Sequence, residues 1–494
     1  MITKDVRDKY QATIGIECHV QFNTKSKLFS AVGNDAREAP PNTLVSHIDF
    51  GLPGALPVLN KEAVHLAIVA AFALGTSPQR FSKFDRKHYF YPDLPMGYQI
   101  TQYDQPIILG GSVDINVDGS VKKIGITRAH LEADAGKSIH PEGQDYSLVD
   151  LNRAGTPLLE IVSEPDMHTS AEAKTYAHEL FLRMKYAGVS DANLYYGNMR
   201  FDVNVSVSDK PDVLGTRTET KNLNSFRSVE KTVDYEIDRQ IEVLEKGGSI
   251  VQETRGWDDA KQKTFSQRIK ENADDYRYMP DPDIPPVVIG EAEIEKVKSE
   301  MPTMPHEWRE RLSQLGLATA HIETLLDAEV EDSQASYLPL IEKNLDNKEL
   351  ATYLANWFVN LEIPLHRQSQ VTAKLADTAR LDTYLATYNL IKANKLSSTN
   401  AKALLNELLV NENTPSDIAA YAESQGFLQV SDEGEIAKIV SQVISENAKA
   451  AEDVKKGETK ATQFLVGQVM KLSKGKANPQ VAQELIKKQL GLNG

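Results

Sequence analysis

The sequence predicts an α+β protein whose N-terminal part is built on an antiparallel sheet and whose remaining parts are all-helical. Up to about Asp283, short runs of alternating apolar and polar residues are separated by Gly, Pro, Asp and Asn turns, which is typical of strands. The segment Asp281-Pro-Asp-Ile-Pro-Pro286 then interrupts regular structure, and the patterns beyond it are nearly all helical. A chain of 494 residues is too long for one core and predicts about three domains. We expect them at residues 1–290, 291–410 and 411–494.

Helices are expected wherever apolar residues recur on one face. One clear helix should interrupt the strands from about Ser228 to Lys246, with Asn224 or Ser225 as its N-cap and Gly247-Gly248 at its end. The longest apolar run, Leu66–Leu74, is far shorter than the roughly 20 residues of a membrane span and predicts a buried helix. Further helices are predicted at Glu291–Glu300, Asn347–Asn360, Val371–Asn394 and Asn400–Leu409, and Ser431–Leu490 should form a bundle containing the N-cap Asn478 followed by Pro479.

Composition narrows the class of protein. The single cysteine, Cys18, excludes an internal disulfide and a thiolate metal cluster, and the N-terminus resembles neither a secretory signal nor a transit peptide, so we expect a cytoplasmic protein. The net charge of −15 argues weakly against nucleic-acid binding, which nevertheless needs only a local basic surface. From Ala451 onward the chain holds eight lysines and four acidic residues, so the C-terminus is its basic end.

Four predicted strands of the first domain carry an unusual polar face. Residues two apart in a strand point to the same side, so Glu17 and His19 share a face opposite the apolar Ile14, Ile16, Cys18 and Val20. By the same rule, three further strands each have polar residues on one shared face: His130 and Glu132; Arg200, Asp202, Asn204 and Ser206; and Arg217, Glu219 and Lys221. Any one face could simply be solvated. Together, carboxylates suited to Mg²⁺ and cations suited to phosphate favour a site for a Mg-nucleotide.

Other phosphate-binding signals are weaker. Gly136-Lys137-Ser138 resembles the end of a P-loop, but Leu131 stands where that loop requires a glycine. The segment Lys83–Asp93, which includes Arg86 and Lys87, mixes charge with aromatic residues and could bind phosphate or stack a base; it could equally be a charged loop anchored by buried rings. In the tail, Lys471, Lys474 and Lys476 follow an apolar helix pattern, and they could contact RNA or only compensate the helix dipole.

The stretch Asp150-Leu-Asn-Arg-Ala-Gly-Thr-Pro-Leu-Leu-Glu-Ile-Val-Ser-Glu-Pro-Asp166 is the most informative in the chain. It is a short apolar strand bounded by turns and edged by Asn152, Arg153, Glu160 and Glu164. It closely resembles the signature of the B subunit of the bacterial aspartyl/glutamyl-tRNA amidotransferase, the GatB family. The resemblance continues over essentially the whole chain through Gly15-Ile-Glu-Cys-His-Val20, Ser26-Lys-Leu-Phe29, Lys83-Phe-Asp-Arg-Lys87, Tyr98-Gln-Ile-Thr-Gln-Tyr-Asp104, Ser190-Asp191, Lys221-Asn-Leu-Asn-Ser-Phe226, Gln252-Glu-Thr-Arg255, Asp274-Asp-Tyr-Arg-Tyr278 and a tail similar to the family's YqeY-like domain.

This resemblance implies a cradle domain related to the catalytic domain of glutamine synthetase, then a helical domain and a tRNA-binding tail. It implies a heterotrimer in which the other two members are an amidase, the A subunit, and a small C subunit. The amidase would release ammonia from glutamine. The B subunit would use ATP to phosphorylate the side-chain carboxyl of Glu on tRNA(Gln), or of Asp on tRNA(Asn), and ammonia would then displace the phosphate.

The resemblance also assigns residues. Glu17, His19, Glu132 and Asp202 match the family's candidate metal and catalytic site. Face and charge suggest Arg200 and Lys221 as contacts to phosphate or acyl phosphate, and we add Arg86, Lys87, Asn152 and Arg153 to the candidate phosphate ligands, with Lys471, Lys474 and Lys476 for tRNA. Two departures bear on the metal site: Ala133 stands where a second Glu is common, and Tyr195-Tyr196-Gly-Asn198 replaces a more acidic stretch.

Two alternatives remain from the sequence. The chain could be a non-catalytic tRNA-binding scaffold that has lost its metal chemistry, which Ala133 would suggest, or a stand-alone Mg-ATP ligase. The sequence shows no signature of a glutamine-hydrolysing site, since it has no Ser-Ser-Lys pattern and Cys18 lies on an apolar face.

Overall fold

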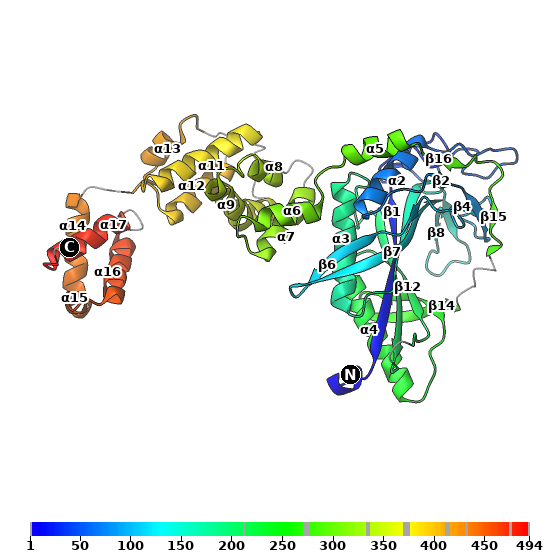
Figure 1. The fold of residues 1–494 in the computed structure, drawn as a ribbon, viewed down its shortest axis with the longest axis horizontal. Coiled ribbons are helices and arrows are strands. Elements are labelled where there is room, and N and C mark those ends of the chain that lie inside the picture. Colours follow the sequence, from blue (N-terminus) through cyan, green and yellow to red (C-terminus); the bar gives the residue numbers. More distant parts are fainter. Residues whose placement is uncertain are drawn as a thin grey trace. The chain divides into compact units, whose positions relative to one another are not determined.

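The computed structural model describes residues 2–210, 213–269, 276–331, 336–368, 376–410, 415–429, 433–473 and 477–492. It divides into two compact units, Met1–Glu307 and Trp308–Gly494, and each is described by itself. The first is mixed α/β and sheet-rich, and the second is helical, as predicted (Figure 1). No helix of the described residues is long and apolar enough to cross a membrane.

A nine-stranded sheet organises the first unit. Its order is β14-β13-β12-β11-β1-β10-β7-β5, and β6 pairs with β7. All neighbours are antiparallel except β12 and β13, which are parallel. The strands are β1 (Gln11–Gln21), β5 (Ile108–Leu109), β6 (Ser112–Val117), β7 (Ser120–Ala133), β10 (Pro157–Ser163), β11 (Met199–Ser208), β12 (Thr218–Leu223), β13 (Glu253–Asp258) and β14 (Lys263–Ile269).

Short strands complete the unit around this sheet. They are β2 (Phe81–Ser82), β3 (Asp85–His88), β4 (Tyr98–Thr101), β8 (Lys137–Ile139), β9 (Leu148–Asp150), β15 (Met279–Pro280) and β16 (Val287–Val288). They form three small sheets, β15-β3-β4, β16-β2 and β8-β9. The first of these brings a segment near residue 280 beside the segment near residue 86.

Helices cover one face of the large sheet. They are α2 (Lys61–Ala73), α3 (Ser170–Tyr186) and α4 (Phe226–Glu245), and a short α1 (Lys4–Arg7) precedes β1. Figure 1 shows α3 and α4 lying along the sheet, where α3 contacts β1 and α4 contacts β11. The apolar face predicted for β1 is confirmed, since its four apolar residues are buried in the core. The opposite face is left open for polar side chains.

The predicted helices of this unit are confirmed with small shifts. The long helix is α4, and Ser225 is its N-cap, accepting a hydrogen bond from Ser228 N. The buried helix predicted at Leu66–Leu74 is α2, which begins before Leu66, directly after its N-cap Asn60. The sequence missed α3. Its inner face buries the pair Glu179 and Arg183, with Nε 3.0 Å from Oε1, and this charged pair weakens the apolar period on which prediction depends.

The first unit extends beyond residue 290. Helix α5 (Glu291–Ser299) packs on α2, and Ile294, Val297 and Met304 join the core of the sheet domain. Residues 291–307 thus belong to the first compact unit. The division of the chain into three domains stays a prediction.

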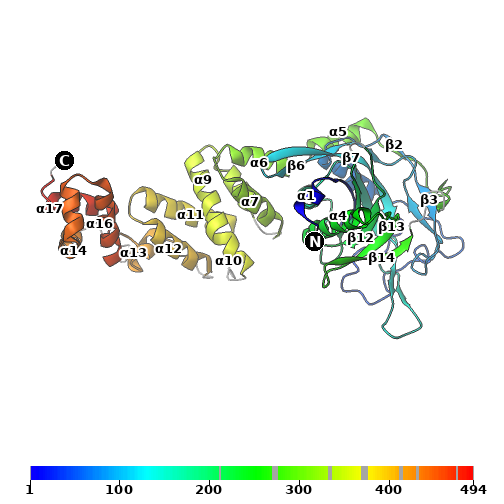
Figure 2. The same ribbon diagram turned by 90° about the horizontal axis from the view of Figure 1, so that it is seen from below.

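The second unit is built only from helices in its described residues. They are α6 (Pro305–Ser313), α7 (Thr319–Glu331), α8 (Tyr337–Glu342), α9 (Lys348–Trp357), the π-helix η2 (Phe358–Glu362), α10 (Ile363–Arg367), α11 (Asp377–Lys392), α12 (Ser398–Val410), α13 (Ile418–Ser424), α14 (Glu433–Glu446), α15 (Ala448–Lys455), α16 (Thr459–Leu472) and α17 (Pro479–Gln489). The last four form a bundle around their own core (Figures 1 and 2). Asn478 caps α17 as predicted. The start of the helix predicted at Val371 lies outside the described residues, and α11 supplies the rest.

Candidate active site

The open face of the large sheet carries a row of aligned polar residues. Along four neighbouring strands, Arg200 on β11 pairs with His19 on β1, His19 with Glu160 on β10, and Glu160 with His130 on β7. Two residues away along these strands, Glu17 on β1 pairs with Asp202 on β11. The antiparallel register thus converts four separate alternating patterns into one continuous polar surface.

All of these residues except His130 line a cleft of about 590 Å³. It contains all four residues predicted for metal and catalysis, together with Arg200, Lys221 and Lys87. Segments far apart along the chain therefore converge on one cleft. The full lining is Glu17, His19, Lys87, Tyr89, Tyr91, Asp93, Gln99, Glu132, Asp134, Ala135, Leu158, Glu160, Arg200, Asp202, Glu219, Lys221, Asn222, Thr254, Gln267 and Tyr276.

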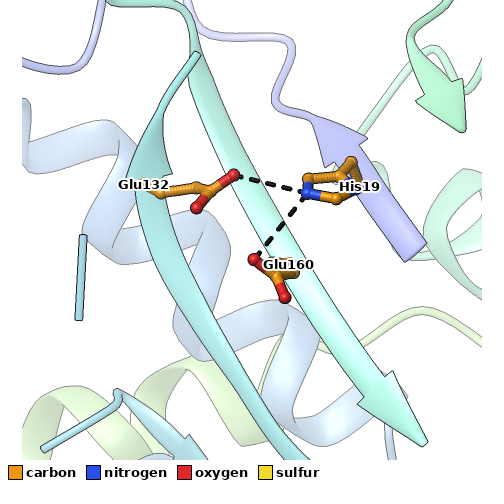
Figure 3. A group of neighbouring side chains, drawn as sticks. All are labelled: His19, Glu132 and Glu160. Carbon is orange, nitrogen blue, oxygen red and sulfur yellow. Dashed lines mark ion pairs between the residues drawn. The ribbon is translucent and has the colours of Figure 1, made fainter. Parts of the chain in front are cut away.

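The acidic residues form two groups, each able to offer three ligand atoms to an ion. In the first, His19 Nε2 lies 3.4 Å from Glu132 Oε1 and 3.7 Å from Glu160 Oε2. Figure 3 shows the three side chains pointing toward one another from three strands. Glu160 was not among the predicted ligands, although its pattern gave a signal: it is the one charged residue of the apolar strand β10, Pro157–Ser163.

The second group consists of Glu17, Asp202 and Glu219, whose carboxylate oxygens lie within 4.8 Å of one another. Lys221 Nζ contacts two of them, at 2.7 Å from Asp202 Oδ2 and 2.9 Å from Glu219 Oε1. Asn204 Nδ2 donates to Glu17 Oε1 over 3.1 Å. Glu219 was recognised only as sharing a face with Lys221, because the sequence does not show which strand lies beside β12.

Electrostatics keeps most of these groups charged despite burial. Although burial favours the neutral form, hydrogen bonds from His130 and His19 hold the pKa of Glu132 well below its ordinary value. Burial would also raise the pKa of Glu160, yet the charge of His130 lowers it to about 2. Burial alone would lower the pKa of His19, but its hydrogen bond to Glu132 and the charge of Glu160 raise it to about 9. The histidines thus act as the counter-charges of this group.

The second group behaves differently. Burial, followed by the charges of Glu160 and Glu219, raises the pKa of Glu17. Burial opposes ionisation of Asp202 as well, but Lys221 and His19 lower its pKa overall. Lys221 thus contacts Asp202, whose pKa is lowered, and does not contact Glu17, whose pKa is raised.

This donor set fits a hard divalent cation. Five carboxylates and one imidazole offer mainly oxygen ligands, which Mg²⁺ and Mn²⁺ prefer, and thiolates are absent from the cleft lining of the described residues. In addition, Asn204 Oδ1 is buried and has no hydrogen-bond partner among the described residues. A buried acceptor oxygen beside Glu17 is consistent with an ion or its water in this group.

Ala133 removes no ligand from these groups. It is buried in the hydrophobic core and follows Glu132 directly in β7. Since neighbouring residues of a strand point to opposite faces, a carboxylate at 133 would point away from the cleft. The reason for suspecting a non-catalytic scaffold therefore lapses.

Not every predicted phosphate ligand lies in the cleft. Arg86 Nε contacts Asp281 Oδ2 at 2.8 Å and its second nitrogen contacts Asp283 at 2.8 Å, which ties β3 to the segment after β15. Asn152 is buried and holds a loop, accepting from Leu44 N and donating to Pro40 O, each over 2.8 Å.

Arg153 binds Asp134 Oδ2 at 3.2 Å. With Asn152 it lines a neighbouring cleft of about 480 Å³. Asp134 also contacts Arg200 at 3.3 Å, so this one acid links a residue of each cleft.

The predicted tRNA contacts belong to the second unit. Lys471 lies exposed in the last turn of α16. Lys474 and Lys476 lie outside the described residues.

Comparison with known proteins decides the family. The GatB/GatE catalytic domain matches residues 12–295, and the GatB domain matches residues 340–490. The chain belongs to the GatB family. It is 45% identical to the B subunit of the aspartyl/glutamyl-tRNA(Asn/Gln) amidotransferase of Caldanaerobacter subterraneus subsp. tengcongensis over 98% of this chain and 99% of that protein. The corresponding protein of Coxiella burnetii (strain CbuG_Q212) is also 45% identical, over 98% and 100%. The GatB catalytic domain thus coincides with the sheet domain that carries both acidic groups.

Proposed function

We propose that this GatB chain is the amidating member of a glutamine-dependent tRNA amidotransferase. Its substrates are ATP and Glu-tRNA(Gln), Asp-tRNA(Asn) or both, and its partners are the amidase, or A subunit, which supplies ammonia, and the small C subunit. The observation that carries this function is the convergence of two acidic groups and several cations in one cleft of the GatB catalytic domain. Residues 1–290 form the proposed cradle, related in fold to glutamine synthetase, and residues 291–410 the helical domain.

The reaction has two steps. An oxygen of the substrate carboxylate attacks the γ-phosphorus of ATP, the bond from that phosphorus to the bridging oxygen breaks, and ADP leaves. Ammonia then adds to the carbon of the acyl phosphate, the carbon–oxygen bond to phosphate breaks, and the nitrogen loses a proton to leave the amide. Phosphoryl transfer depends mainly on positioning and charge stabilisation, so the site needs cations around the phosphates.

Lys87 is the cation best placed for the transferred phosphate. Its Nζ forms no ion pair within 4.0 Å among the described residues and instead lies over the rings of Tyr276 and Tyr89, at 4.8 and 5.8 Å from their centroids. Although burial would lower the pKa of Lys87, Glu132 and the other nearby acids raise it above its ordinary range. Lys221 and Arg200 already contact acids, so an incoming phosphate would share them with those acids.

The two acidic groups are proposed to hold Mg²⁺. When bound, such ions would supply positive charge that stabilises the phosphate groups during transfer. Glu17, Asp202 and Glu219 would hold one ion, and His19, Glu132 and Glu160 a second. The backbone N–H of Asn222 keeps Asp202 oriented, donating to its Oδ1 over 2.7 Å.

The tail, residues 411–494, is proposed to bind tRNA. Lys471 lies exposed in the last turn of α16, and the surplus of lysine over acid from Ala451 onward favours binding to a phosphate backbone. Replacing Lys471, Lys474 and Lys476 by Met should weaken tRNA binding and flatten its salt dependence. The KM for ATP should not change, because the residues proposed to hold ATP all belong to the sheet domain.

The test is reconstitution of the three-protein holoenzyme with Mg²⁺, ATP and each charged tRNA. Glu17→Gln and Glu132→Gln should each lower amide formation by on the order of 10²-fold or more, because a buried charge that stabilises phosphoryl transfer is lost. Their tRNA affinity should match that of the unmodified protein. Glu142→Gln, in an exposed loop, is the control. If both cleft variants kept full activity, the catalytic function would be wrong, and the chain would act as a non-catalytic scaffold.

A further inference from the structure

One wall of the cleft is aromatic. Tyr89, Tyr91 and Tyr276, called here the tyrosine wall, all line it. The rings of Tyr89 and Tyr91 meet edge to face with centroids 5.9 Å apart, and those of Tyr89 and Tyr276 do so at 6.2 Å. The rest of the lining consists mostly of acids, cations and amides, so three phenol rings in one place are a distinct surface.

The tyrosine wall is held in place by the protein. Tyr89 Oη donates to Gln99 Oε1 over 3.4 Å, and Gln99 Nε2 donates to the carbonyl of Ala133 over 2.9 Å, which fixes the wall to β7 of the large sheet. Behind it, Tyr276 meets Tyr278 edge to face at 6.1 Å, and Tyr278 stacks on Tyr103 at 3.9 Å. An interlocked set of rings offers a rigid surface, which costs little ordering entropy when a flat ligand binds.

Burial varies across the tyrosine wall. Tyr89 and Tyr276 are partly buried, whereas Tyr91 is 48% exposed while still lining the cleft. Lys87 Nζ lies over Tyr276 and Tyr89 and is close enough to Glu132 and Glu160 for their charges to raise its pKa. The tyrosine wall therefore has an exposed ring, Tyr91, at one end, and the cation Lys87 lies between its other two rings and the first acidic group.

We infer that the tyrosine wall binds the adenine base of an adenosine-bearing substrate, with Tyr91 as the exposed stacking residue. This inference rests on the proposed function, whose two substrates both carry adenosine next to the reacting group: ATP through its phosphates, and charged tRNA through its 3′-terminal nucleoside. Aromatic rings stack on bases with little regard to base identity, and a neighbouring cation suits the attached phosphate or carboxylate. Lys87 supplies that cation.

A simpler role for the rings is to shield Lys87. Tyr91 separates the two roles, because the ring contacts of Lys87 are with Tyr89 and Tyr276, and Tyr91 packs on Tyr89. If the rings only shield the lysine, then Tyr91 can lose its aromatic character without consequence for substrate binding.

The experiment uses the holoenzyme with Tyr91→Phe, which keeps the ring, and Tyr91→Leu, which removes it. Tyr146→Leu is the matched control, since Tyr146 is 53% exposed and is outside the lining of the described clefts. Tyr91→Leu should raise one KM by about 5- to 150-fold, the range expected for one stacked base, and Tyr91→Phe should stay within about twofold. A rise confined to ATP assigns the wall to the nucleotide, and a rise confined to charged tRNA assigns it to the 3′-terminal adenosine.

Direct binding keeps the inference separate from catalysis. Dissociation constants are measured calorimetrically for Mg-ATP and for a CCA trinucleotide, with Mn²⁺ binding and the melting temperature as checks on folding. If Tyr91→Leu has a lowered melting temperature, Tyr91→Trp provides a second test because it enlarges the ring. Tyr91→Trp should bind the adenosine ligand at least as tightly as the unmodified protein does. Equal KM values and dissociation constants in all Tyr91 variants overturn the inference even if amidation is normal. Loss of adenosine binding in Tyr91→Leu supports it even if the unmodified complex fails to amidate, which would count against the proposed function alone.

Discussion

His130 on β7 stands directly opposite Glu160 on β10, with His130 Nε2 3.3 Å from Glu160 Oε2. The same nitrogen lies 3.8 Å from Glu132 Oε2. His130 is 4% exposed, and its Nδ1 has no hydrogen-bond partner among the described residues. It is thus placed to orient both carboxylates of the first acidic group from the neighbouring strand. Such support of ligands by residues behind them is a general feature of metal sites.

His130→Leu should therefore lower the affinity of the cleft for Mn²⁺ by about 10- to 100-fold, the usual effect of removing a group that orients a metal ligand. His130→Gln, which keeps a polar donor, should recover part of that loss. Mn²⁺ titration followed by electron paramagnetic resonance gives the dissociation constants. His168→Leu, which removes a histidine bound to Ala12 O elsewhere in the same sheet domain, is the control. An unchanged Mn²⁺ affinity in a folded His130→Leu protein would show that Glu132 and Glu160 need no such support.

The pKa of His19 makes a signed prediction for the metal-free protein. Its folded pKa of about 9 exceeds the ordinary 6.5, so protonated His19 stabilises the folded state fully below pH 6.5, and this contribution disappears as the pH rises to about 9. The difference in unfolding free energy between the unmodified protein and His19→Gln should be largest near pH 6 and smallest above pH 9. Denaturant titrations with a chelator present measure it.

The control for this titration is His140→Gln, a substitution in an exposed loop outside the cleft lining. A difference that is constant from pH 6 to 9.5 would mean that His19 is not the protonated partner of Glu132 and Glu160. With Mn²⁺ present, the stability contributed by His19 should instead increase as the pH rises, because a metal-bound imidazole must be neutral and its proton is released on binding.

Lys221 occupies the second acidic group as an internal cation. Its ammonium contacts Asp202 and Glu219, two of the three residues that would hold an ion. Lys221→Met should therefore tighten Mn²⁺ binding, because a competing positive charge is removed, while the metal-free protein becomes less stable because buried acids lose their partner. Calorimetric titration and thermal melting test the two effects together. Lys174→Met, which breaks the more exposed pair with Glu230, should change neither by much. Weaker Mn²⁺ binding in Lys221→Met would show that the lysine orients the acids and does not compete with the ion.

Much of the site could be predicted because the period of a strand is two. That rule alone placed Glu17 with His19, Arg200 with Asp202, and Cys18 on the buried side. It could not show the register between strands, which is decided by contacts between residues far apart in sequence. Glu160 joins the first acidic group only because β10 pairs with β1 at His19 and with β7 at His130.

The same rule, applied more strictly, separates Arg86 from Lys87. As neighbours in β3 they must point to opposite sides, and the structure places Lys87 in the cleft and Arg86 against Asp281. From the sequence, only their shared positive charge groups them. The phosphate role of Arg86 stays a prediction, but its contacts are those of a residue that ties two segments together.

Backbone geometry beside Asp202 gives a last prediction. The pairing of β11 with β12 shifts register between Phe201 and Val203, and Asn222 opposite this irregularity has a positive φ of 60°. This conformation lets Asn222 N donate to Asp202 Oδ1 over 2.7 Å. Asn tolerates the left-handed region better than most residues, and Gly adopts it freely, whereas a β-branched residue does not.

Asn222→Gly should therefore keep both stability and Mn²⁺ affinity. Asn222→Val should cost about 1–2 kcal/mol of unfolding free energy and also weaken Mn²⁺ binding, because the backbone donor that orients Asp202 moves. Asn224→Val is the matched control, since Asn224 is exposed two residues away and does not have a positive φ. Denaturant unfolding and Mn²⁺ titration are compared across the three variants. If Asn222→Gly loses metal affinity as severely as Asn222→Val, the side chain of Asn222 is the important group and the backbone argument is wrong; if Asn222→Val binds Mn²⁺ normally, Asp202 is held by Lys221 alone.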